Sequence, residues 1–408
     1  MSATSGISLS RIYKTYKQTQ MIILDKPYIS EFLLDTLERN SIPVIHNHVV
    51  SDYVQGRNLN LLSEEDAIQR FNGFGNPLLY TNSENSISWI ENNLQNTSLP
   101  GKIQLFKNKV LFRDLISDLF PGYFYKGISV DDLERIDVSG FPLPFIVKPA
   151  VGFFSLGVYK VEKSEEWNET VKSILKEIDL IKDLYPPEVL HTGEFIIEEC
   201  IEGDEFAIDC YFNNEGNPVV LNIMKHIFSS GKDVNDRVYI TSKDIIESYL
   251  HSITEFLHEI GLRAGLQNFP AHVEVRIDEN GIVAPIEVNP LRFGGWCSTP
   301  DLAWYAFGIN IYEYLFQQRT PDWNTILTGK ESLVFSNIVL NNSTGTEGKN
   351  IRSFNYDKLL SDFEKPLELR KADFKKFPIF GFLFCETRME NMDELHRILM
   401  SDLKEYVE

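Results

Sequence analysis

Short apolar runs separated by amphipathic stretches characterise the first part of the chain. Apolar runs lie at 21–24, 42–45 and 77–80, and residues 87–94 have the apolar spacing of a helix. Such short runs are typical of buried strands. Strands that alternate with helices favour a parallel sheet covered on both faces. The pattern therefore predicts a Rossmann-like domain over residues 21–110.

The pattern changes after this domain. Apolar spacing predicts a helix over 111–119, strands at 145–148 and 157–161, and a long helix from 165 to about 184. A turn that contains glycine separates the two strands. Together these elements predict a compact α+β module over residues 111–192.

The next segment is typical of antiparallel strands. Apolar stretches at 195–199, 205–212 and 218–228 are separated by short polar turns, which predicts an antiparallel meander. A helix over 243–261 follows. The elements predicted near the C-terminus are a helix at 301–316, strands at 333–340 and 377–384, and a charged terminal helix.

One predicted hairpin carries polar residues inside apolar strands. Its strands, 272–277 and 282–289, are joined by a turn that ends in Asn-Gly, a strong hairpin signal. Because the side-chain period of a strand is two, Glu287 and Asn289 share a face, and Glu274 can face them across the pair. A solvated sheet face is the alternative, although asparagine is unfavourable within a strand. Two carboxylates and an amide oxygen on one face suit Mg²⁺.

Composition narrows the functional classes. The 408 residues include 39 Lys and Arg against 59 Asp and Glu, and the resulting charge of −20 repels nucleic acid and anionic membranes. The four cysteines lack the spacing of a zinc site or a disulfide framework. The first twenty residues lack the apolar core of a secretory signal, and no later run has membrane-spanning length. We expect a cytoplasmic protein without nucleic-acid or membrane partners.

The order of these motifs resembles the ATP-grasp superfamily. In that family a Glu-x-Asn pair ends one strand and an acid precedes it on the neighbouring strand, as Glu287, Asn289 and Glu274 do here. The 13 positions between the two glutamates resemble the spacing of the D-alanine:D-alanine ligase branch. The resemblance implies that these residues bind the Mg²⁺ ions that bridge the ATP phosphates. It also implies that Lys109 and Lys148 hold phosphates.

The nucleotide-binding segments of the family have counterparts here. The run 195–205 resembles the hinge that reads the adenine edge, and the loop 152–157 lies where the family closes a glycine loop over the phosphates. Two phenylalanines make this loop less glycine-rich than usual. The nucleotide contacts that the resemblance implies are Ser155 in the loop, Glu198, Glu199, Cys200 and Ile201 in the hinge, and Glu205 at the ribose hydroxyls.

Three basic residues are candidates for catalysis. Lys225, in an apolar strand, matches a family lysine directed at the phosphates. Arg292 lies in a run that resembles the family's Asn-Pro-Arg with one residue inserted, and it is implied to stabilise the acyl phosphate or the oxyanion. Arg276 shares a face with Glu274 and can either contact phosphate or pair with Glu287.

The resemblance implies an α/β and α+β architecture, an ATP-grasp fold preceded by a Rossmann-like (preATP-grasp) domain. The expected parts are an N-terminal extension (1–20), the Rossmann-like domain (21–110), a small ATP-grasp subdomain (111–192), a large subdomain with the Mg-ATP site (193–325) and its C-terminal part (326–408).

The function implied is that of an ATP- and Mg²⁺-dependent ligase, with Mn²⁺ as a substitute metal. It would join a small-molecule carboxylate, such as an amino acid, to an amine through an acyl phosphate and release ADP. A biotin-carboxylase-like enzyme and a nucleotide-binding regulatory protein are the alternatives. Dimers are common in the family, so we expect a homodimer.

Overall fold

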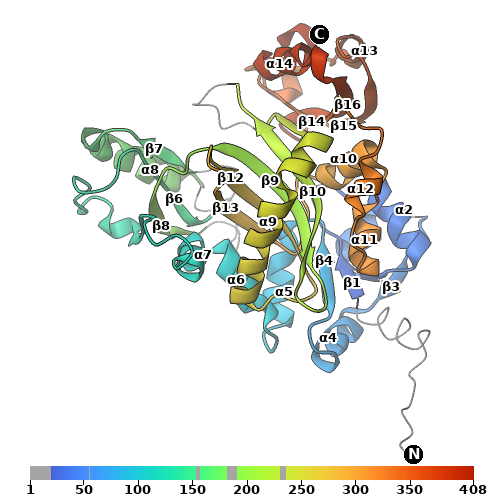
Figure 1. Ribbon diagram of the computed structural model, residues 1–408, viewed down its shortest axis with the longest axis horizontal. Coiled ribbons are helices and arrows are strands. Elements are labelled where there is room, and N and C mark those ends of the chain that lie inside the picture. The colour runs from blue at the N-terminus through green and yellow to red at the C-terminus, as the bar shows by residue number, and fades with distance from the viewer. Residues whose placement is uncertain (1–19, 55, 153–156, 182–190, 230–235) are drawn as a thin grey trace, which may run out of the picture.

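The computed structural model describes residues 20–54, 56–152, 157–181, 191–229 and 236–408 (Figure 1). The N-terminal extension expected over 1–20 lies outside these ranges except for its last residue. Within them, the chain forms three β-sheets with helices packed around them. This confirms the predicted combination of α/β and α+β architecture.

The first sheet is parallel, with strand order β3-β2-β1-β4, as predicted for a Rossmann-like domain. Every residue of β1, β2 and β4 is buried, because helices cover both faces. Ser30, Asn47 and Ser63 cap the helices α2, α3 and α4 with their side chains. The elements are β1 (Gln20–Ile23), α2 (Glu31–Asn40), β2 (Pro43–Ile45), α3 (His48–Tyr53), β3 (Asn60–Leu62), α4 (Glu64–Gly73), β4 (Leu78–Thr81) and α5 (Ile87–Asn93).

Two helices lead from the first sheet to the second, which also has four strands, in the order β5-β8-β6-β7 with antiparallel neighbours. Helix α8 packs against it, and the rings of Phe145 and Trp167 lie 5.8 Å apart in its separate core. The predicted end of α8 near 184 lies outside the described residues. The elements are α6 (Leu99–Lys107), α7 (Lys109–Ile116), β5 (Tyr125–Ser129), β6 (Phe145–Val151), β7 (Tyr159–Val161), α8 (Trp167–Ile181) and β8 (His191–Glu199).

The prediction of a meander that starts at 195–199 was wrong for its first strand. Strand β8 pairs with β5 and β6 rather than with the strand that follows it. After β8 the chain turns at Gly203, which has a φ of 109°. A Cβ atom there would lie 2.3 Å from the carbonyl oxygen of Ile277. Glycine therefore permits the turn that takes the chain from the second sheet into the third.

The third sheet is the largest, with strand order β13-β12-β9-β10-β11-β14-β16-β15 and antiparallel neighbours throughout. The predicted β12–β13 hairpin is confirmed, and Gly281 takes a φ of 78° in its turn. The strands are β9 (Asp204–Phe212), β10 (Pro218–Ile227), β11 (Val238–Ser242), β12 (Phe269–Ile277), β13 (Val283–Pro290), β14 (Leu333–Asn341), β15 (Pro366–Lys371) and β16 (Ile379–Arg388).

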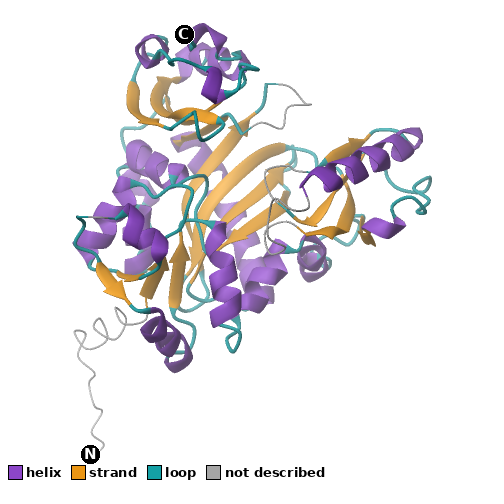
Figure 2. Cartoon of the chain, turned by 180° about the vertical axis from the view of Figure 1, so that it is seen from behind, coloured by secondary structure: helices purple, strands orange, loops and turns teal. Residues whose placement is uncertain are grey.

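Different elements cover the two faces of this sheet. The long helix α9 (Lys243–Ala264) crosses one face, where the ring centroid of Tyr249 lies 4.5 Å from that of Phe206 (Figure 1). Residues after β13 cover the other face, and the view from behind shows the first sheet on that side (Figure 2). Asn337 of β14 donates a hydrogen bond to Ser298 at the start of α10 (Ser298–Phe307).

The single helix predicted over 301–316 is two helices. Helix α10 ends at Gly308, which has a φ of 68°, and α11 (Ile311–Gln317) begins after Asn310. The Asn310 side chain accepts hydrogen bonds from the amides of Tyr312 and Glu313. A left-handed glycine followed by a capping asparagine breaks a pattern whose apolar spacing alone suggests continuity. The remaining helices are α12 (Trp323–Ile326), α13 (Tyr356–Ser361) and α14 (Asp393–Met400).

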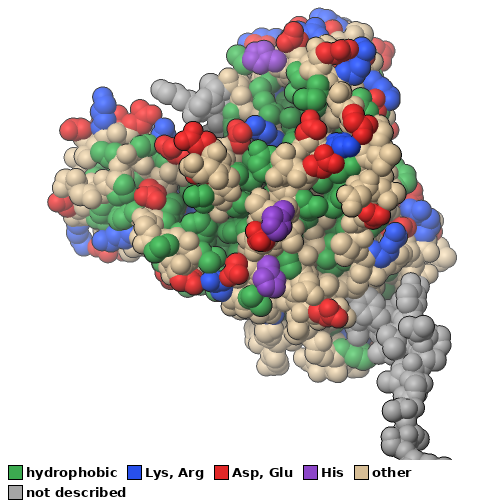
Figure 3. Space-filling view, viewed as in Figure 1, with side chains coloured by type: hydrophobic (Ala, Val, Ile, Leu, Met, Phe, Trp, Pro, Cys, Tyr) green, Lys and Arg blue, Asp and Glu red, His purple; other side chains and the backbone are tan. Residues whose placement is uncertain are grey.

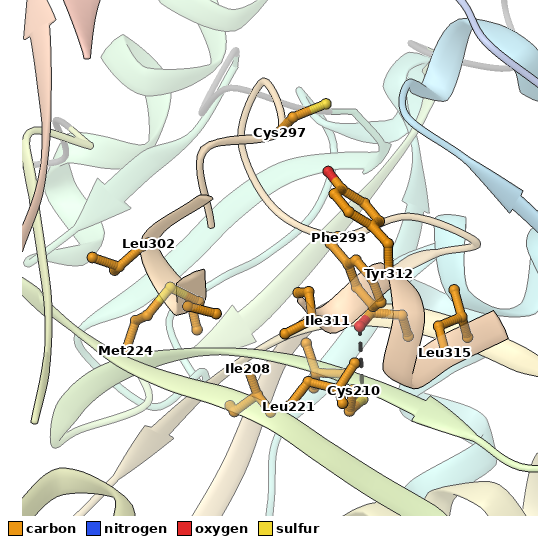
Figure 4. Close-up of a cluster of buried hydrophobic side chains, with 14 of the residues drawn as sticks. Ile208, Cys210, Leu221, Met224, Phe293, Cys297, Leu302, Ile311, Tyr312 and Leu315 are labelled. Atoms are coloured by element: carbon orange, nitrogen blue, oxygen red, sulfur yellow. Dashed lines mark hydrogen bonds between the residues drawn. The ribbon is translucent and has the colours of Figure 1, made fainter. Parts of the chain in front are cut away.

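The main core joins the first sheet to the third. Tyr312 of α11 packs against Tyr80 of β4 at 5.6 Å and against Phe293, which follows β13, at 6.0 Å. Figure 4 shows Tyr312 and Phe293 above the strand residues Ile208 and Leu221. This core fixes the position of the segment after β13 relative to the first sheet.

Surface and sequence features agree with a globular protein. Figure 3 shows acidic and basic side chains dispersed among hydrophobic ones over one face. All four cysteines are unpaired in the structure. None of the helices in the described ranges combines the length and the hydropathy needed to cross a membrane.

Candidate active site

Two glutamates and an asparagine meet on the β12–β13 hairpin. In this ladder Glu274 lies opposite Glu287, and His272 lies opposite Asn289. The Asn289 amide donates a hydrogen bond of 2.9 Å to Glu287 Oε1. The structure thus brings together the three residues that the sequence suggests as metal ligands.

The two glutamates have different electrostatic surroundings. Burial raises the pKa of Glu274 well above its usual range, and the charges of Glu287, Glu205 and Asp236 raise it further. Burial acts in the same direction on Glu287, but the charges of Lys109 and Lys107 and the hydrogen bond from Asn289 together outweigh it and lower the pKa of Glu287. Uncompensated negative charge therefore surrounds Glu274, and an added cation would favour its ionised form.

The donor set fits a hard divalent cation. The side-chain oxygens of Glu274, Glu287 and Asn289 are ligands of the kind that Mg²⁺ takes, usually together with phosphate oxygens and water. Across the described ranges of the chain, no group of three or more His, Cys, Asp and Glu side chains is arranged to hold a metal. A cation at the hairpin would therefore need oxygen atoms from a bound substrate to complete its shell.

Lys109 approaches the same acids from helix α7. Asn108 caps this helix and accepts hydrogen bonds from its first amides, so Lys109 lies at a fixed N-terminal position. The Lys109 Nζ atom is 3.6 Å from Glu287 Oε2 and donates a hydrogen bond of 3.3 Å to the Gly152 carbonyl. Burial lowers the pKa of Lys109 despite the nearby Glu287. The loop residues 153–156, Ser155 among them, lie outside the described residues.

Lys148 belongs to a buried charge cluster behind the hinge. Glu198 of β8 pairs with Lys148 Nζ at 2.6 Å and with Arg113 Nε at 2.7 Å, and its side chain is only 3% exposed. Burial alone would raise the pKa of Glu198, but the charges of Lys148 and Arg113 lower it to about 2. Glu198 therefore orients Lys148 and remains ionised at neutral pH.

Protein contacts hold the backbone of the hinge. The Glu199 carbonyl accepts a hydrogen bond from the Tyr123 hydroxyl at 3.0 Å, and the Cys200 amide donates to Pro144 at 3.3 Å. The Ile201 carbonyl accepts from an Arg276 guanidinium nitrogen at 3.1 Å. Since a carbonyl oxygen has two lone pairs, Glu199 and Ile201 can each accept a further hydrogen bond.

Glu205 lies at the same end of the site. Its two carboxylate oxygens contact Arg276 at 3.1 Å and His226 Nδ1 at 3.0 Å. Burial would raise the pKa of Glu205, but these partners lower it. Arg276 thus pairs with Glu205 and not with Glu287, the alternative that the sequence left open.

Lys225 is separated from the other candidates. In the β9–β10 ladder it lies opposite Phe206, which packs on Tyr249 of α9. Neighbouring residues of a strand point to opposite faces, so Lys225 faces α9 while His226 faces the site. The Lys225 Nζ atom pairs with Asp204 at 2.6 Å. This placement gives no support to a phosphate contact by Lys225.

Arg292 pairs with Glu84, an acid that follows strand β4 of the first sheet. Two of its guanidinium nitrogens donate to Glu84 Oε1, at 3.1 and 2.7 Å, and a third donates to the Phe293 carbonyl. Lys107, the last residue of α6, pairs with Glu84 Oε2 at 2.6 Å. Burial would raise the pKa of Glu84, yet Lys107 and Arg292 hold it below its usual range. The inserted residue before Arg292 thus leaves the arginine beside the acids and lysines of the site.

A buried pair, Asp209 of β9 and His272 of β12, lies beside the acids of the hairpin. Asp209 Oδ1 contacts His272 Nδ1 at 2.8 Å and accepts a hydrogen bond from the Gly294 amide at 3.0 Å. The other ring nitrogen of His272 is 3.7 Å from Glu274. A Cβ atom on Gly294 would lie 2.4 Å from the His272 ring. The segment after β13 therefore packs directly against the strand that carries Glu274.

Sequence reasoning missed several of these residues. Asp209 and His272 are polar residues inside apolar strands, and this is the same sequence signal that identified Glu287 and Asn289. Glu84 follows the carboxyl end of a parallel strand, where open α/β sheets bind ligands. Lys107 and Arg113 lie in amphipathic helices and resemble ordinary surface residues in sequence.

Comparisons with known proteins show which family part of the chain resembles. Residues 141–300 match the sequence model described as the ATP-grasp domain. This part of the chain is therefore similar to an ATP-grasp domain. The matched range includes Lys148, the hinge and the acids of the β12–β13 hairpin. No curated protein sequence matches the chain.

Solved structures share the fold of nearly the whole chain. An L-amino acid ligase from Bacillus licheniformis is 18% identical, covers 95% of this chain and 97% of its own, and has a TM-score of 0.66. A biotin carboxylase complexed with β,γ-ATP from Campylobacter jejuni is 11% identical, with 90% and 87% covered and a TM-score of 0.61. The biotin carboxylase domain of Hydrogenobacter thermophilus 2-oxoglutarate carboxylase, complexed with MgADP and bicarbonate, is 12% identical, with 90% and 86% covered and a TM-score of 0.57.

Proposed function

We propose that the protein is an ATP- and Mg²⁺-dependent ligase that joins a small-molecule carboxylate to an amine and releases ADP and phosphate. The observation that carries this proposal is that Lys109 of α7 meets Glu274, Glu287 and Asn289, which lie in the region that matches an ATP-grasp domain. A carboxylate surrounded by negative charge, Glu274, lies opposite Glu287, which pairs with a lysine at a helix N-terminus, and this arrangement suits a metal–triphosphate complex.

The site offers contacts for each part of the nucleotide. The resemblance assigns the adenine edge to the hinge, where the carbonyls of Glu199 and Ile201 each keep accepting capacity. It assigns the ribose hydroxyls to Glu205, whose carboxylate is ionised and oriented by Arg276. Lys148 would hold phosphate oxygens. This assignment is supported by Glu198, which fixes the lysine without exposing its own charge to solvent.

The proposed metal site is the oxygen cluster of Glu274, Glu287 and Asn289. Bound there, Mg²⁺ would neutralise phosphate charge as the γ-phosphoryl group is transferred. The Asn289–Glu287 hydrogen bond orients one carboxylate for this task. Mn²⁺ has similar ligand preferences and would substitute for Mg²⁺.

The chemistry has two steps. A carboxylate oxygen of the first substrate attacks the γ-phosphorus of ATP, which releases ADP and forms an acyl phosphate. The amine then attacks the acyl carbon, the phosphate leaves, and the amine loses a proton. Arg292 would stabilise the negative charge that develops on the carbonyl oxygen, because its guanidinium is fixed before the reaction by Glu84.

The test is ADP release from Mg-ATP across amino acids and other small carboxylates, supplied singly and with amines. The proposal predicts release that requires one carboxylate–amine pair. Lys148→Met and Lys225→Met form a matched comparison, since each lysine lies in a strand and pairs with an acid at 2.6 Å. We expect Lys148→Met to lower turnover by about 100-fold or more and Lys225→Met to retain it.

Other outcomes separate the alternatives. Release that needs bicarbonate but no amine would favour a carboxylase. Tight binding of Mg-ATP without release for any substrate would favour a regulatory protein. Loss of turnover in Lys225→Met but not in Lys148→Met would overturn the assignment of the phosphate lysine. The four unpaired cysteines also support a reducing, cytoplasmic location.

A further inference from the structure

The Arg292 segment is held by the first sheet through three successive residues. The Leu291 carbonyl accepts a hydrogen bond of 2.8 Å from the Thr81 amide. Arg292 pairs with Glu84. The ring of Phe293 lies 5.1 Å from that of Tyr80. One short stretch, residues 80–84, which holds the end of β4 and the turn after it, therefore contacts each residue of the segment 291–293.

The backbone of this segment needs such support. Leu291 has a φ of 63°, a left-handed conformation that costs a non-glycine residue energy and persists when surrounding contacts enforce it. Its amide donates to the Pro270 carbonyl at 2.8 Å, and its carbonyl accepts from Thr81. These two bonds, one to the third sheet and one to the first, fix the direction in which Arg292 leaves the backbone.

Glu84 adds ion pairs to these backbone and ring contacts. Its side chain is 13% exposed, and those of Arg292 and Lys107 are 16% and 4% exposed. One carboxylate thus binds two buried cations from different elements, α6 and the segment after β13. The cluster keeps one net positive charge, which suits a site for an anionic group. Without Glu84, both cations would repel each other and lose their fixed directions.

We propose that Glu84 is a positioning residue, which holds Arg292 and Lys107 at the reaction centre and couples the Rossmann-like sheet to the ATP-grasp domain. This inference rests on the proposed function for the role of Arg292. Glu84 acts through these cations, because its Oε1 accepts two hydrogen bonds from Arg292 and its Oε2 accepts one from Lys107.

The first test does not depend on activity. In protein labelled with ¹⁵N at arginine, the Nε–H signal of Arg292 is the one absent from Arg292→Lys. Glu84→Asp keeps the charge but shortens the side chain, so it should fold while releasing the arginine. We expect hydrogen exchange at Arg292 Nε–H to accelerate by about tenfold or more. Glu91→Asp is the matched control, since Glu91 also contacts α6, through Gln104, and should leave the exchange unchanged. Unchanged exchange in Glu84→Asp would overturn the positioning role.

The second test is a double-mutant cycle on turnover. Glu84→Asp should lower kcat by about tenfold and leave ATP binding unchanged, and Arg292→Ala should lower kcat by about 100-fold. In the Arg292→Ala background, Glu84→Asp should lower kcat little further, because the effects of residues that act as a unit are not additive. If the double variant instead shows the product of the two single reductions in kcat, Glu84 acts independently of Arg292. If no substrate pair supports turnover, the proposed function fails, and the exchange experiment still decides the role of Glu84.

Discussion

Glu198 should make the stability of the protein depend on pH in a defined way. Its carboxylate is shared between Lys148 and Arg113 in a cluster closed to solvent. Its pKa falls from 4.5 to about 2, which corresponds to about 3 kcal/mol in favour of the folded state. A carboxyl group whose pKa is lower in the folded state stabilises the protein at pH values above the pKa that the group has in the unfolded chain. This stability is present above about pH 4.5 and is lost as the pH falls towards about 2.

The perturbation is Glu198→Gln, which removes the charge and keeps the shape. We expect the variant to be less stable than the wild type by about 3 kcal/mol at pH 7, because two buried cations lose their partner. The assay is urea unfolding followed by tryptophan fluorescence, since Trp167 lies in the core of the same sheet. The difference between the two proteins should narrow as the pH falls below about 4.5. Glu202→Gln, at an exposed position, is the control. A difference that does not change with pH would refute the reasoning.

Three further predictions follow from the site and its surroundings. Glu287→Ala should weaken Mn²⁺ binding beside a non-hydrolysable ATP analogue by about tenfold or more in an electron paramagnetic resonance titration, and unchanged affinity would contradict the metal assignment. Burial raises the pKa of Asp301 from 3.8 to about 6, so the wild type should lose about 3 kcal/mol of unfolding free energy as the pH rises through that interval. Asp301→Asn should abolish this loss in urea titrations, and equal pH slopes for both proteins would count against it. Gly294→Ala should destabilise the protein by about 1–3 kcal/mol, because its Cβ would meet the His272 ring. Gly101→Ala, with open space around the added Cβ, should not destabilise it. A melting temperature of Gly294→Ala equal to that of the wild type would contradict the clash.

The elements that the sequence predicts best are those with a strong local signal. The Asn-Gly turn and the two-residue period of polar side chains place Glu274 opposite Glu287, and the ladder has this register. The parallel first sheet follows from short apolar runs that alternate with helices. In these cases the local pattern and the tertiary packing favour the same structure.

The predictions that failed depend on contacts between segments that are distant in sequence. Strand β8 has the apolar pattern of a meander strand, but its partners come from 125–129 and 145–151 and cannot be inferred from its own residues. Lys225 matches a family motif by its neighbours in sequence, yet the alternation along β10 turns its side chain towards α9. Glu84 is distant in sequence from every motif and reaches Arg292 only because the first sheet docks beside it.

The most direct test of the account is the fate of oxygen from the carboxylate substrate. The pair that supports ADP release would be supplied with ¹⁸O in the carboxylate, and the products would be analysed by mass spectrometry. An acyl phosphate intermediate predicts one ¹⁸O atom in the released inorganic phosphate. ¹⁸O in AMP, or phosphate without label, would contradict phosphoryl transfer to the carboxylate and with it the proposed ligase mechanism.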